Sequence, residues 1–488
     1  MQKVLSILYF AHITTGKDDP PLTDDHAQEK SALFVATLSS FMGPFMISSV
    51  NVALPAIQQE FAADAVVLSW VATALLLAVA AFLIPLGKIG DIYGRKKVFT
   101  FGLLVCTLAS LAGAFSVSMP MLITVRVFQG FGTAMFVTTG MAIVTSVFPP
   151  QRRGRAIGLY VSAVYIGLSV GPFAGGLLTQ HLGWRSNFGV VVPFGAASIW
   201  VTLKYLKGEW ADARGERLDV AGSLLYAAAV FLLVYGASLL PRWPAVCLIL
   251  TGAVALTVFV RFELRTPQPV FDVRMFSGNR LFAFSCLAAL INYAATFAIT
   301  FLVSLFLQYI KGLTPQAAGT ILVAQPVVMA CFSPLAGRLS DRIEPRLISS
   351  AGMTLTVLGL LLFALVGTET SEYYIIATLM VLGLGFALFS SPNMNAIMGA
   401  VDKKFFGIAS GTVAAMRLLG QMTSMAIAMV VFAVFIGREQ ITPNNYDLFL
   451  KSVKMSFGIF TLLCTIGIFF SYSRGSLRHA GGRGSTPG

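Results

Sequence analysis

The stretch LFAFSCLAALINYAATFAITFLVSLFLQYI, at positions 281–310, contains no charged side chain. A second uncharged run covers positions 32–59. A helix needs about 20 apolar residues to cross the hydrocarbon core of a bilayer, so each run is long enough to span a membrane. Neither run alternates between apolar and polar residues, as the strands of a membrane β-barrel do. These stretches predict an all-α membrane protein.

The composition extends this prediction to the whole chain. Of 488 residues, 56% are hydrophobic and only 11% are charged, whereas about 25% of the residues of a soluble domain are charged. This balance excludes an ordinary soluble enzyme and a nucleic-acid-binding protein. The net charge of +13 comes from basic residues in the predicted loops, where membrane topology accounts for them.

We predict fourteen membrane helices, which at about 20 residues each would use roughly 280 residues. A charged linker, residues 207–219, separates the sixth helix from the seventh. The predicted helices cover residues 32–54, 67–86, 98–116, 121–145, 156–178, 188–206, 220–239, 243–260, 284–307, 317–339, 347–366, 375–397, 408–435 and 453–472.

The distribution of basic residues predicts the orientation. With the N-terminus inside, 26 of the 34 lysines and arginines fall in inner segments and six in outer loops. Because Lys and Arg favour cytoplasmic loops, we expect a plasma (inner) membrane protein with both termini in the cytoplasm. The expected organisation is an N-terminal tail (1–30), a six-helix bundle (31–206), a linker with two extra helices (207–280), a second six-helix bundle (281–473) and a disordered C-terminal tail (474–488).

Motifs for metal binding, ATP hydrolysis and catalysis are missing from the sequence. No two of the five cysteines have metal-site spacing, and the four histidines lie in predicted tails and one loop. There is no GxxxxGK[ST] phosphate loop, and no cluster of His, Asp or Glu at one membrane face. We therefore expect no metal, no cofactor, no ATP and no enzyme activity.

A weak internal repeat divides the chain into two related halves. Gly87-Lys-Ile-Gly-Asp91-Ile-Tyr-Gly94-Arg95-Lys96-Lys97 follows the second predicted helix, and Gly337-Arg-Leu-Ser-Asp341-Arg342 follows the tenth. Each has a glycine, an acid four residues later and then basic residues. Parallel repeats of this kind are a transporter architecture. We interpret both loops as a gating motif; the alternative is an ordinary basic loop, which would not explain the repeated Gly/Asp spacing.

Four motifs in this order resemble the major facilitator superfamily, in its 14-helix drug:proton antiporter branch. They are the loop 87–97, Arg126-Val-Phe-Gln129-Gly130-Phe-Gly132, Asn51-Val-Ala-Leu-Pro55, and Gly167-Leu-Ser-Val-Gly171-Pro172-Phe-Ala-Gly175-Gly176. The resemblance implies a major facilitator fold with two six-helix bundles and two extra central helices. It also implies a secondary transporter that exports small organic or amphipathic compounds by alternating access with proton coupling.

One position departs from the branch. An acidic residue usually lies five positions before the helix-one asparagine, where this chain has Met46. The resemblance therefore does not carry over proton coupling by that acid. If protons are coupled, the sequence offers only Asp91, Asp341 or the substrate itself as the titrating group.

The helix-five motif predicts a close helix contact. Gly167, Gly171 and Gly175 recur every four residues and form a smooth stripe on one helix face, where two backbones can approach closely. Pro172 interrupts the backbone hydrogen bonds beside this stripe. The family resemblance, rather than this geometry, links the stripe and Gly176 to export.

Two arginines, Arg126 and Arg417, lie inside predicted membrane helices, whereas no acidic residue lies in the middle of one. A buried arginine is costly unless it is paired or hydrated. We expect both to face a water-filled cavity, to bind carbonyls or polar side chains, or to contact an anionic group of the substrate. The predicted substrate or coupling cavity comprises Arg126, Gln129, Met46, Asn51, Asn292, Tyr293, Gln325, Asn393, Arg417 and Gln421.

Two arginines in a low-dielectric cavity would repel a cationic drug, so an organic anion or a neutral compound fits the sequence better. Symport or uniport remains an alternative to antiport, as does a non-transporting membrane protein or a lipid-moving member of the same fold. The expected partners are the bilayer, a small-molecule substrate and, if transport is proton-coupled, protons, with a monomer as the expected assembly.

Overall fold

The computed structural model describes residues 24–216, 218–240, 242–266, 274–401, 406–437 and 439–475. Within these ranges every regular element is a helix, and fourteen helical segments are long and apolar enough to cross a membrane. The predicted all-α fold and the number of membrane helices are therefore confirmed. Residues 1–23 and 476–488, which belong to the two predicted tails, lie outside the described residues.

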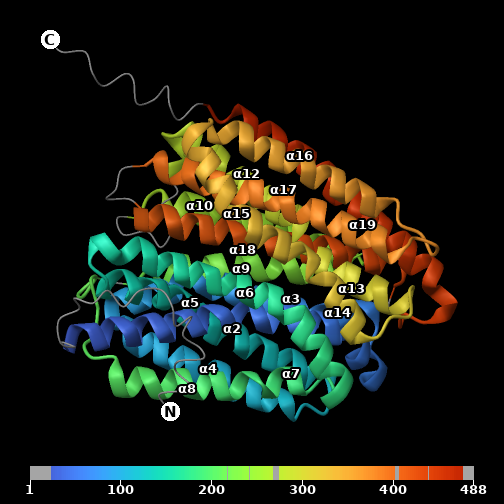
Figure 1. Cartoon of the computed structure of the whole chain (residues 1–488), viewed down its shortest axis with the longest axis horizontal. Helices are drawn as coiled ribbons and strands as arrows, with labels where there is room; N and C mark the ends of the chain where they lie inside the picture. The colour runs from blue at the N-terminus through green and yellow to red at the C-terminus, as the bar shows by residue number, and fades with distance from the viewer. Residues whose placement is uncertain are drawn as a thin grey trace, which may run out of the picture.

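The helices follow one another with short connections (Figure 1). The first six spans and the inserted pair comprise α2 (Asp24–Phe61), α3 (Ala65–Tyr93), α4 (Arg95–Ala114), α5 (Met119–Val147), α6 (Pro150–Leu182), α7 (Ser186–Gly189), α8 (Val191–Tyr205), α9 (Val220–Ser238) and α10 (Trp243–Glu263). The last six comprise α11 (Arg274–Ser277), α12 (Arg280–Thr296), α13 (Ile299–Tyr309), α14 (Pro315–Leu322), α15 (Ala324–Arg342), α16 (Pro345–Ala364), α17 (Glu372–Gly399), α18 (Phe406–Phe435), η2 (Pro443–Asn445) and α19 (Tyr446–Ser473).

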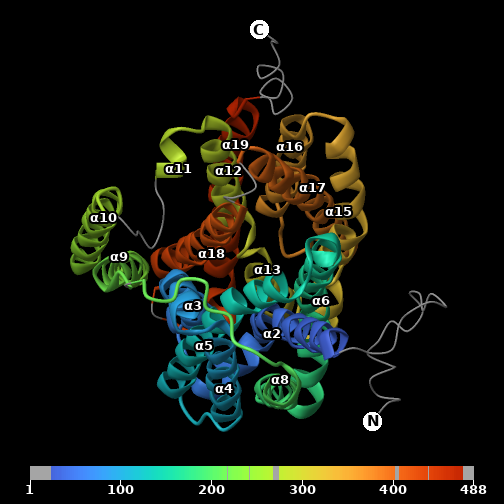
Figure 2. The ribbon, with the colours of Figure 1, turned by 90° about the vertical axis from the view of Figure 1, so that its left-hand side faces the viewer.

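Two groups of helices lie side by side when the molecule is viewed along the helix axes (Figure 2). One group holds α2–α5 and α8, and the other holds α12, α15–α17 and α19. Helices α6 and α18 lie where the groups meet, since α6 packs on both α2 and α14 and α18 packs on both α12 and α3. We call these groups, with α6 and α18 respectively, the N half and the C half, and count α13 and α14, which follow α12 in the chain, with the C half.

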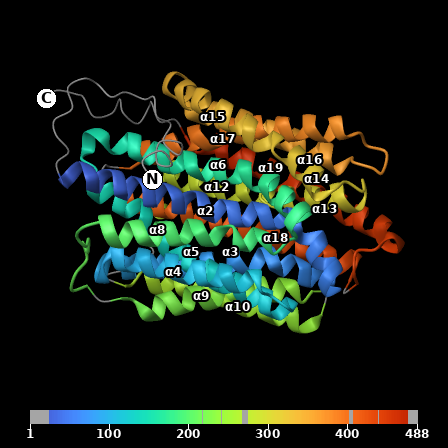
Figure 3. The same ribbon diagram turned by 60° about the horizontal axis from the view of Figure 1, so that its bottom comes forward.

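The inserted pair, α9 and α10, lies beside the seam between the halves (Figures 2 and 3). Helix α9 packs against α10, against α3 of the N half and against α18 of the C half. It is therefore in contact with both halves at once.

Helix starts follow from the capping residues in the sequence. Asp64 accepts a hydrogen bond from the backbone N–H of Val67 at 2.8 Å, and Asp219 accepts one from Gly222 at 2.8 Å. Ser118, Thr314 and Ser371 cap α5, α14 and α17 in the same way. Each cap satisfies a backbone N–H that the first helical turn leaves without a partner, which fixes where these helices begin.

Two spans that the sequence predicts as single helices are broken. Between α12 and α13, the backbone N–H of Ala298 donates to Ser424 Oγ of α18 at 3.0 Å, so a neighbouring side chain takes over a helical hydrogen bond. Between α14 and α15, Pro326 has no N–H to donate to the carbonyl of Leu322. The first helix also begins earlier than expected, at Asp24 rather than residue 32.

The two ends of the molecule differ in what they carry. The end with the start of α2, the turn at Gly94 between α3 and α4, and the linker 207–219 is called the linker end. The opposite end, with the last residues of α2 and α6 and the start of α14, is called the far end. In Figure 1 the helices run roughly horizontally between these ends.

Candidate functional site

The loop between α3 and α4 holds a network of ion pairs at the linker end. Arg95 Nε donates to Asp91 Oδ1 at 2.8 Å, and its Nη1 lies 2.8 Å from Asp212 Oδ2. Nη1 also donates to Ser146 Oγ of α5 at 2.8 Å. The predicted gating residues Asp91 and Arg95 are thus in direct contact, and an acid from the linker joins them.

The linker 207–219 is docked on this loop along its length. Glu209 accepts a hydrogen bond from the backbone N–H of Lys96 at 2.8 Å, and Glu216 pairs with Lys88. Backbone hydrogen bonds also hold the two segments together. The N–H of Arg95 donates to the backbone carbonyl of Trp210 at 2.8 Å, and the N–H of Ala213 donates to the backbone carbonyl of Asp91 at 3.0 Å. The sequence analysis identified the linker as charged but did not predict that its acidic residues contact the basic α3–α4 loop.

Glycine is required at the turn of this loop. Gly94 has φ = 121°, in the region that side chains rarely adopt, and a Cβ there would lie 2.6 Å from Glu209 Oε1. At Gly87, by contrast, a Cβ would meet only the side chain of Thr138, at 3.7 Å. Of the two glycines predicted in this loop, Gly94 is therefore the one that a larger residue could replace less easily.

The second copy of the motif is built differently. Gly337 and Arg342 both lie in α15, and Arg342 is exposed at its end. The side chain of Asp341 lies outside those that the structure describes.

Arg126 is enclosed in the N half rather than lining an open cavity, with 0% of its surface exposed. Its Nε donates to the Val71 carbonyl at 2.8 Å, and its Nη1 donates to Gln129 Oε1 at 3.1 Å and to the Met46 carbonyl at 3.4 Å. Gln129 Nε2 donates in turn to Ser110 Oγ at 2.9 Å. The sequence left several possible environments for Arg126, and in the structure its side chain donates hydrogen bonds to carbonyls and to a polar side chain. The network joins α2, α3, α4 and α5.

Met46 lies at the centre of this network. Its sulfur lies 3.8 Å from Gln129 Nε2 and 3.7 Å from Cys106 Sγ. Arg126 Nη2 is buried without a hydrogen-bond partner, and no carboxylate in the described part of the chain pairs with this guanidinium. The position where the related branch has an acid is therefore next to an arginine with an unused donor.

Arg417 has a different environment, at the seam between the halves. Its side chain is half-buried and interacts electrostatically with the hydroxyl groups of Tyr160 on α6 and Tyr293 on α12. Tyr293 also interacts with Tyr165 of α6, and its ring packs edge-on against Phe386 with centroids 5.5 Å apart. We call Arg417, Tyr160, Tyr165 and Tyr293 the seam cluster. Two of its tyrosines were not among the residues expected from the sequence.

The remaining predicted cavity residues are dispersed. Asn292 is fully buried, and both polar atoms of its side chain are without a partner. Asn51 is buried at the far end, while Gln325 and Gln421 are half-buried on α15 and α18. The side chains of these four take no part in the hydrogen bonds described above for Arg126 and Gln129.

Asn393 belongs to a polar cluster that sequence reasoning missed. Arg474, which was assigned to the disordered tail, is only 1% exposed and directly follows α19. Its guanidinium donates to Asn393 Oδ1, to Ser285 Oγ at 3.2 Å and to Ser349 Oγ at 3.1 Å. Asn393 Nδ2 donates to the Ser285 carbonyl at 3.1 Å. This cluster ties α12, α16, α17 and the end of α19 together.

The glycine stripe of α6 makes the close contact that its spacing predicts. A Cβ at Gly167 would lie 2.5 Å from the Phe41 carbonyl oxygen, and one at Gly175 would lie 2.6 Å from Ser49 Cα. Gly171 packs on Ser48 in the same way. The stripe therefore lies against α2, and Pro172 faces elsewhere, with its carbonyl against Gly319 of α14.

The two halves contact each other extensively at the far end. Gly176 of α6 packs on the Pro315 backbone. Ser304 Oγ donates to the Asn51 carbonyl at 3.1 Å, and Gln308 Nε2 donates to the Val52 carbonyl at 3.0 Å. These contacts use backbone atoms and small residues, so the halves approach closely there.

The match of this arrangement to a known family is direct. The sequence profile of the Major Facilitator Superfamily matches residues 33–264 and 285–485, which is most of the chain. This chain belongs to the Major Facilitator Superfamily. It is a multi-pass membrane transporter rather than an enzyme, and alternating access and proton coupling are typical of its family.

Similar proteins in this superfamily carry transporter names. The chain is 29% identical over 447 residues to the riboflavin transporter RibZ of Clostridioides difficile (strain 630), covering 91% of this chain and 97% of that protein. It is 34% identical over 410 residues to the multidrug resistance protein Stp of Mycobacterium tuberculosis (strain CDC 1551 / Oshkosh), covering 82% and 76%.

Solved structures show the same superfamily fold. A bacterial homologue of the human lysosomal transporter Spinster, described as inward-facing and unoccupied, aligns with a TM-score of 0.67 at 15% identity, covering 96% of this chain and 100% of the other.

Within the ranges the structure describes, no three His, Cys, Asp or Glu side chains come together as a metal site would need.

Proposed function

We propose that this transporter exports small organic or amphipathic compounds from the cytoplasm by alternating access, coupled to a proton gradient. The proposal is supported by the family membership and by the seam cluster, in which Arg417 of the C half interacts electrostatically with tyrosine hydroxyl groups of both halves. A ligand bound there would contact both halves and would be affected by their relative movement. The names of the relatives, which include a multidrug resistance protein and a drug efflux pump, support export.

The seam cluster favours an anionic or neutral substrate with an aromatic ring system. Arg417 offers a positive charge and five N–H donors, and none of the ion pairs between described residues involves it. Tyrosine rings provide flat apolar surfaces with a polar edge. A cation at this position would be repelled by Arg417 in a low-dielectric environment.

The test is transport in proteoliposomes with three dyes of similar size that are anionic, neutral and permanently dicationic. We expect transport of the anionic dye, and an Arg417→Gln variant that transports it at least about tenfold more slowly, since a hydrogen bond to a charged group contributes about 1.5–3 kcal/mol. Arg417→Lys is the matched control and retains part of the rate. Strong transport of the dication, unchanged by Arg417→Gln, would contradict the proposed substrate class.

Riboflavin belongs in the same panel as a second candidate. The similarity to RibZ extends over 91% of this chain, and the aromatic side chains of Tyr293 and Phe386, which pack edge-on, suit a flat, uncharged heterocycle. If riboflavin is transported, Tyr293→Ala should slow its transport more than Arg417→Gln does.

Proton coupling has to use a group other than the helix-one acid of the related branch, because that position is Met46. Asp91, Asp341 and the substrate itself are the candidates from the sequence. Transport measured with and without an imposed pH gradient tests the coupling. A rate independent of the gradient would favour uniport, and acceleration by protons moving with the substrate would favour symport.

We also propose that the linker end faces the cytoplasm of a plasma membrane, with both termini on that side, as the distribution of basic residues predicts. In this orientation the described conformation has its halves joined on the outer side. The gating residues Asp91 and Arg95 would then act at the cytoplasmic surface between the bundles 31–206 and 281–473, in a monomer. Protease accessibility of a C-terminal tag in oriented vesicles tests the orientation.

A further inference from the structure

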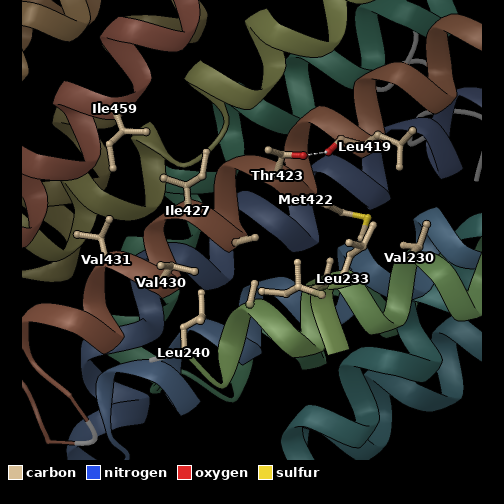
Figure 4. A pocket seen from close by; sticks show the side chains of 14 residues that line it. Val230, Leu233, Leu240, Leu419, Met422, Thr423, Ile427, Val430, Val431 and Ile459 are labelled. Carbon is tan, nitrogen blue, oxygen red and sulfur yellow. Dashed lines mark hydrogen bonds between the residues drawn. The ribbon is translucent and has the colours of Figure 1, made fainter. Parts of the chain in front are cut away.

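An apolar groove of about 460 Å³ runs between the inserted helices and the C half (Figure 4). Helix α9 and the turn that follows it form one wall with Val230, Leu233 and Leu240, and α18 forms the opposite wall. Thr423 is the polar residue in the lining, but its hydroxyl donates to the Leu419 carbonyl of its own helix at 2.8 Å. The groove therefore has an apolar lining.

The length of the groove matches one leaflet of a bilayer. Its lining on α18 extends from Leu419 to Val431, twelve residues that rise about 18 Å at 1.5 Å per residue. The hydrocarbon core of a bilayer is about 30 Å thick, so one leaflet contributes about 15 Å. Both wall helices are membrane spans, and the groove lies in their far-end halves.

A smaller pocket of about 100 Å³ continues from this groove towards the far end. Leu240 lines both spaces, and Arg242 contributes the positive charge of the smaller one. Arg242 is exposed and forms no ion pair with any residue in the described ranges, while its backbone N–H donates to the Leu239 carbonyl at 3.1 Å. Next to it, Trp243 is 76% exposed, as is typical of aromatic residues at a membrane interface.

We propose that the groove and its far-end pocket together bind one anionic phospholipid of the far-end leaflet, with an acyl chain between α9 and α18 and the phosphate at Arg242. The apolar length fits an acyl chain, and the single unpaired guanidinium at its end complements a phosphate. The bound chain would fill the space between α9 and the C half. It would thereby support the contact of the inserted pair with α18.

The test is native mass spectrometry of the full-length protein titrated with palmitoyl-oleoyl phosphatidylglycerol, and separately with the phosphatidylcholine of the same chains. We expect tighter binding of phosphatidylglycerol, and a loss of about tenfold or more in its affinity with Arg242→Gln, since a charge-assisted hydrogen bond contributes about 1.5–3 kcal/mol. Phosphatidylcholine carries the same phosphate beside a positively charged choline, so its binding should weaken less than that of phosphatidylglycerol. Lys311→Gln is the matched control, because Lys311 is a far-end basic residue whose Nζ donates to the Thr368 carbonyl at 2.8 Å.

Variants that fill the groove test the acyl-chain part. Leu233→Trp and, independently, Ile427→Trp should reduce the binding of both lipids, and a melting temperature near that of the wild type shows that each variant is folded. The proposal is overturned if Arg242→Gln binds phosphatidylglycerol like the wild type, if Lys311→Gln weakens binding equally, or if both folded tryptophan variants retain full binding.

Discussion

At the scale of single residues, the chain buries two guanidinium groups in opposite ways. Arg126 is held by carbonyls and by Gln129, whereas Arg474 is held by side chains of three helices, and each keeps one buried nitrogen without a partner. An intramembrane arginine can be found from the sequence because charge is rare in apolar runs. Arg474 could not, because it follows the last apolar run and is buried only by the way α12, α16 and α17 meet.

The free donor of Arg126 predicts the effect of restoring an acid at position 46. Met46→Glu is expected to pair with Arg126 Nη2 and to raise the melting temperature at neutral pH relative to Met46→Gln, which has the same length but no charge. A buried, uncompensated charge is strongly destabilising, and each kcal/mol recovered corresponds to a shift of about 2–4 °C in a domain of 150–250 residues. Thermal unfolding in detergent measures this. A Glu variant that melts below the Gln variant contradicts the predicted pair.

The cluster around Arg474 gives a second prediction. Arg474→Gln should lower the melting temperature clearly, because it removes three hydrogen bonds and leaves Asn393 and Ser285 buried with fewer partners. Arg342→Gln, at an exposed arginine of the same end, is the control and should have little effect. The double variant Arg474→Gln/Asn393→Ala should lose less than the sum of the single variants, since the two residues share one network. Strict additivity would show that they act separately.

At the scale of elements, the sequence predicted what local pattern determines. Apolar runs predicted the fourteen spans, and the four-residue glycine spacing predicted a close helix contact, which the structure shows to be with α2. The breaks at Ala298 and beside Pro326 were missed, because the first depends on Ser424 from another helix. The candidate cavity was predicted only in part for the same reason: which polar residues meet depends on how helices distant in the sequence pack. Arg417 and Tyr293 interact electrostatically, whereas Asn393 accepts a hydrogen bond from Arg474.

The docking of the linker on the α3–α4 loop predicts a charge-swap result. Lys88→Glu and Glu216→Lys should each slow transport, because each places like charges together where the structure has an ion pair. The double variant should recover most of the rate. Partly exposed pairs contribute up to about 1 kcal/mol, so the expected change is at most about fivefold for each single variant. Initial rates in proteoliposomes measure it, and a double variant as slow as the slower single variant would refute a role for the pair.

At the scale of the whole molecule, the far end joins the halves through α2, α6, α13 and α14. The linker end is organised differently, since the linker carboxylates there bind the α3–α4 loop within the N half. If the protein works by alternating access, the far-end contacts have to separate during each cycle. The hydrogen bonds of Ser304 and Gln308 to backbone carbonyls then have to break and re-form.

A reversible cross-link at the far end tests this cycle. The backbone N–H of Gln316 donates to Gln180 Oε1 at 3.3 Å, and His181 lies 3.2 Å from Gln316 Oε1, so these residues of α6 and α14 adjoin across the halves. In a chain whose five cysteines are replaced by serine or alanine, Gln180→Cys/Gln316→Cys should form a disulfide without substrate and stop transport, and a reducing agent should restore it. Each single-cysteine chain is the control and should transport with or without oxidant. Transport at the full rate by the oxidised double variant would mean that the far end does not open, and would exclude alternating access through it.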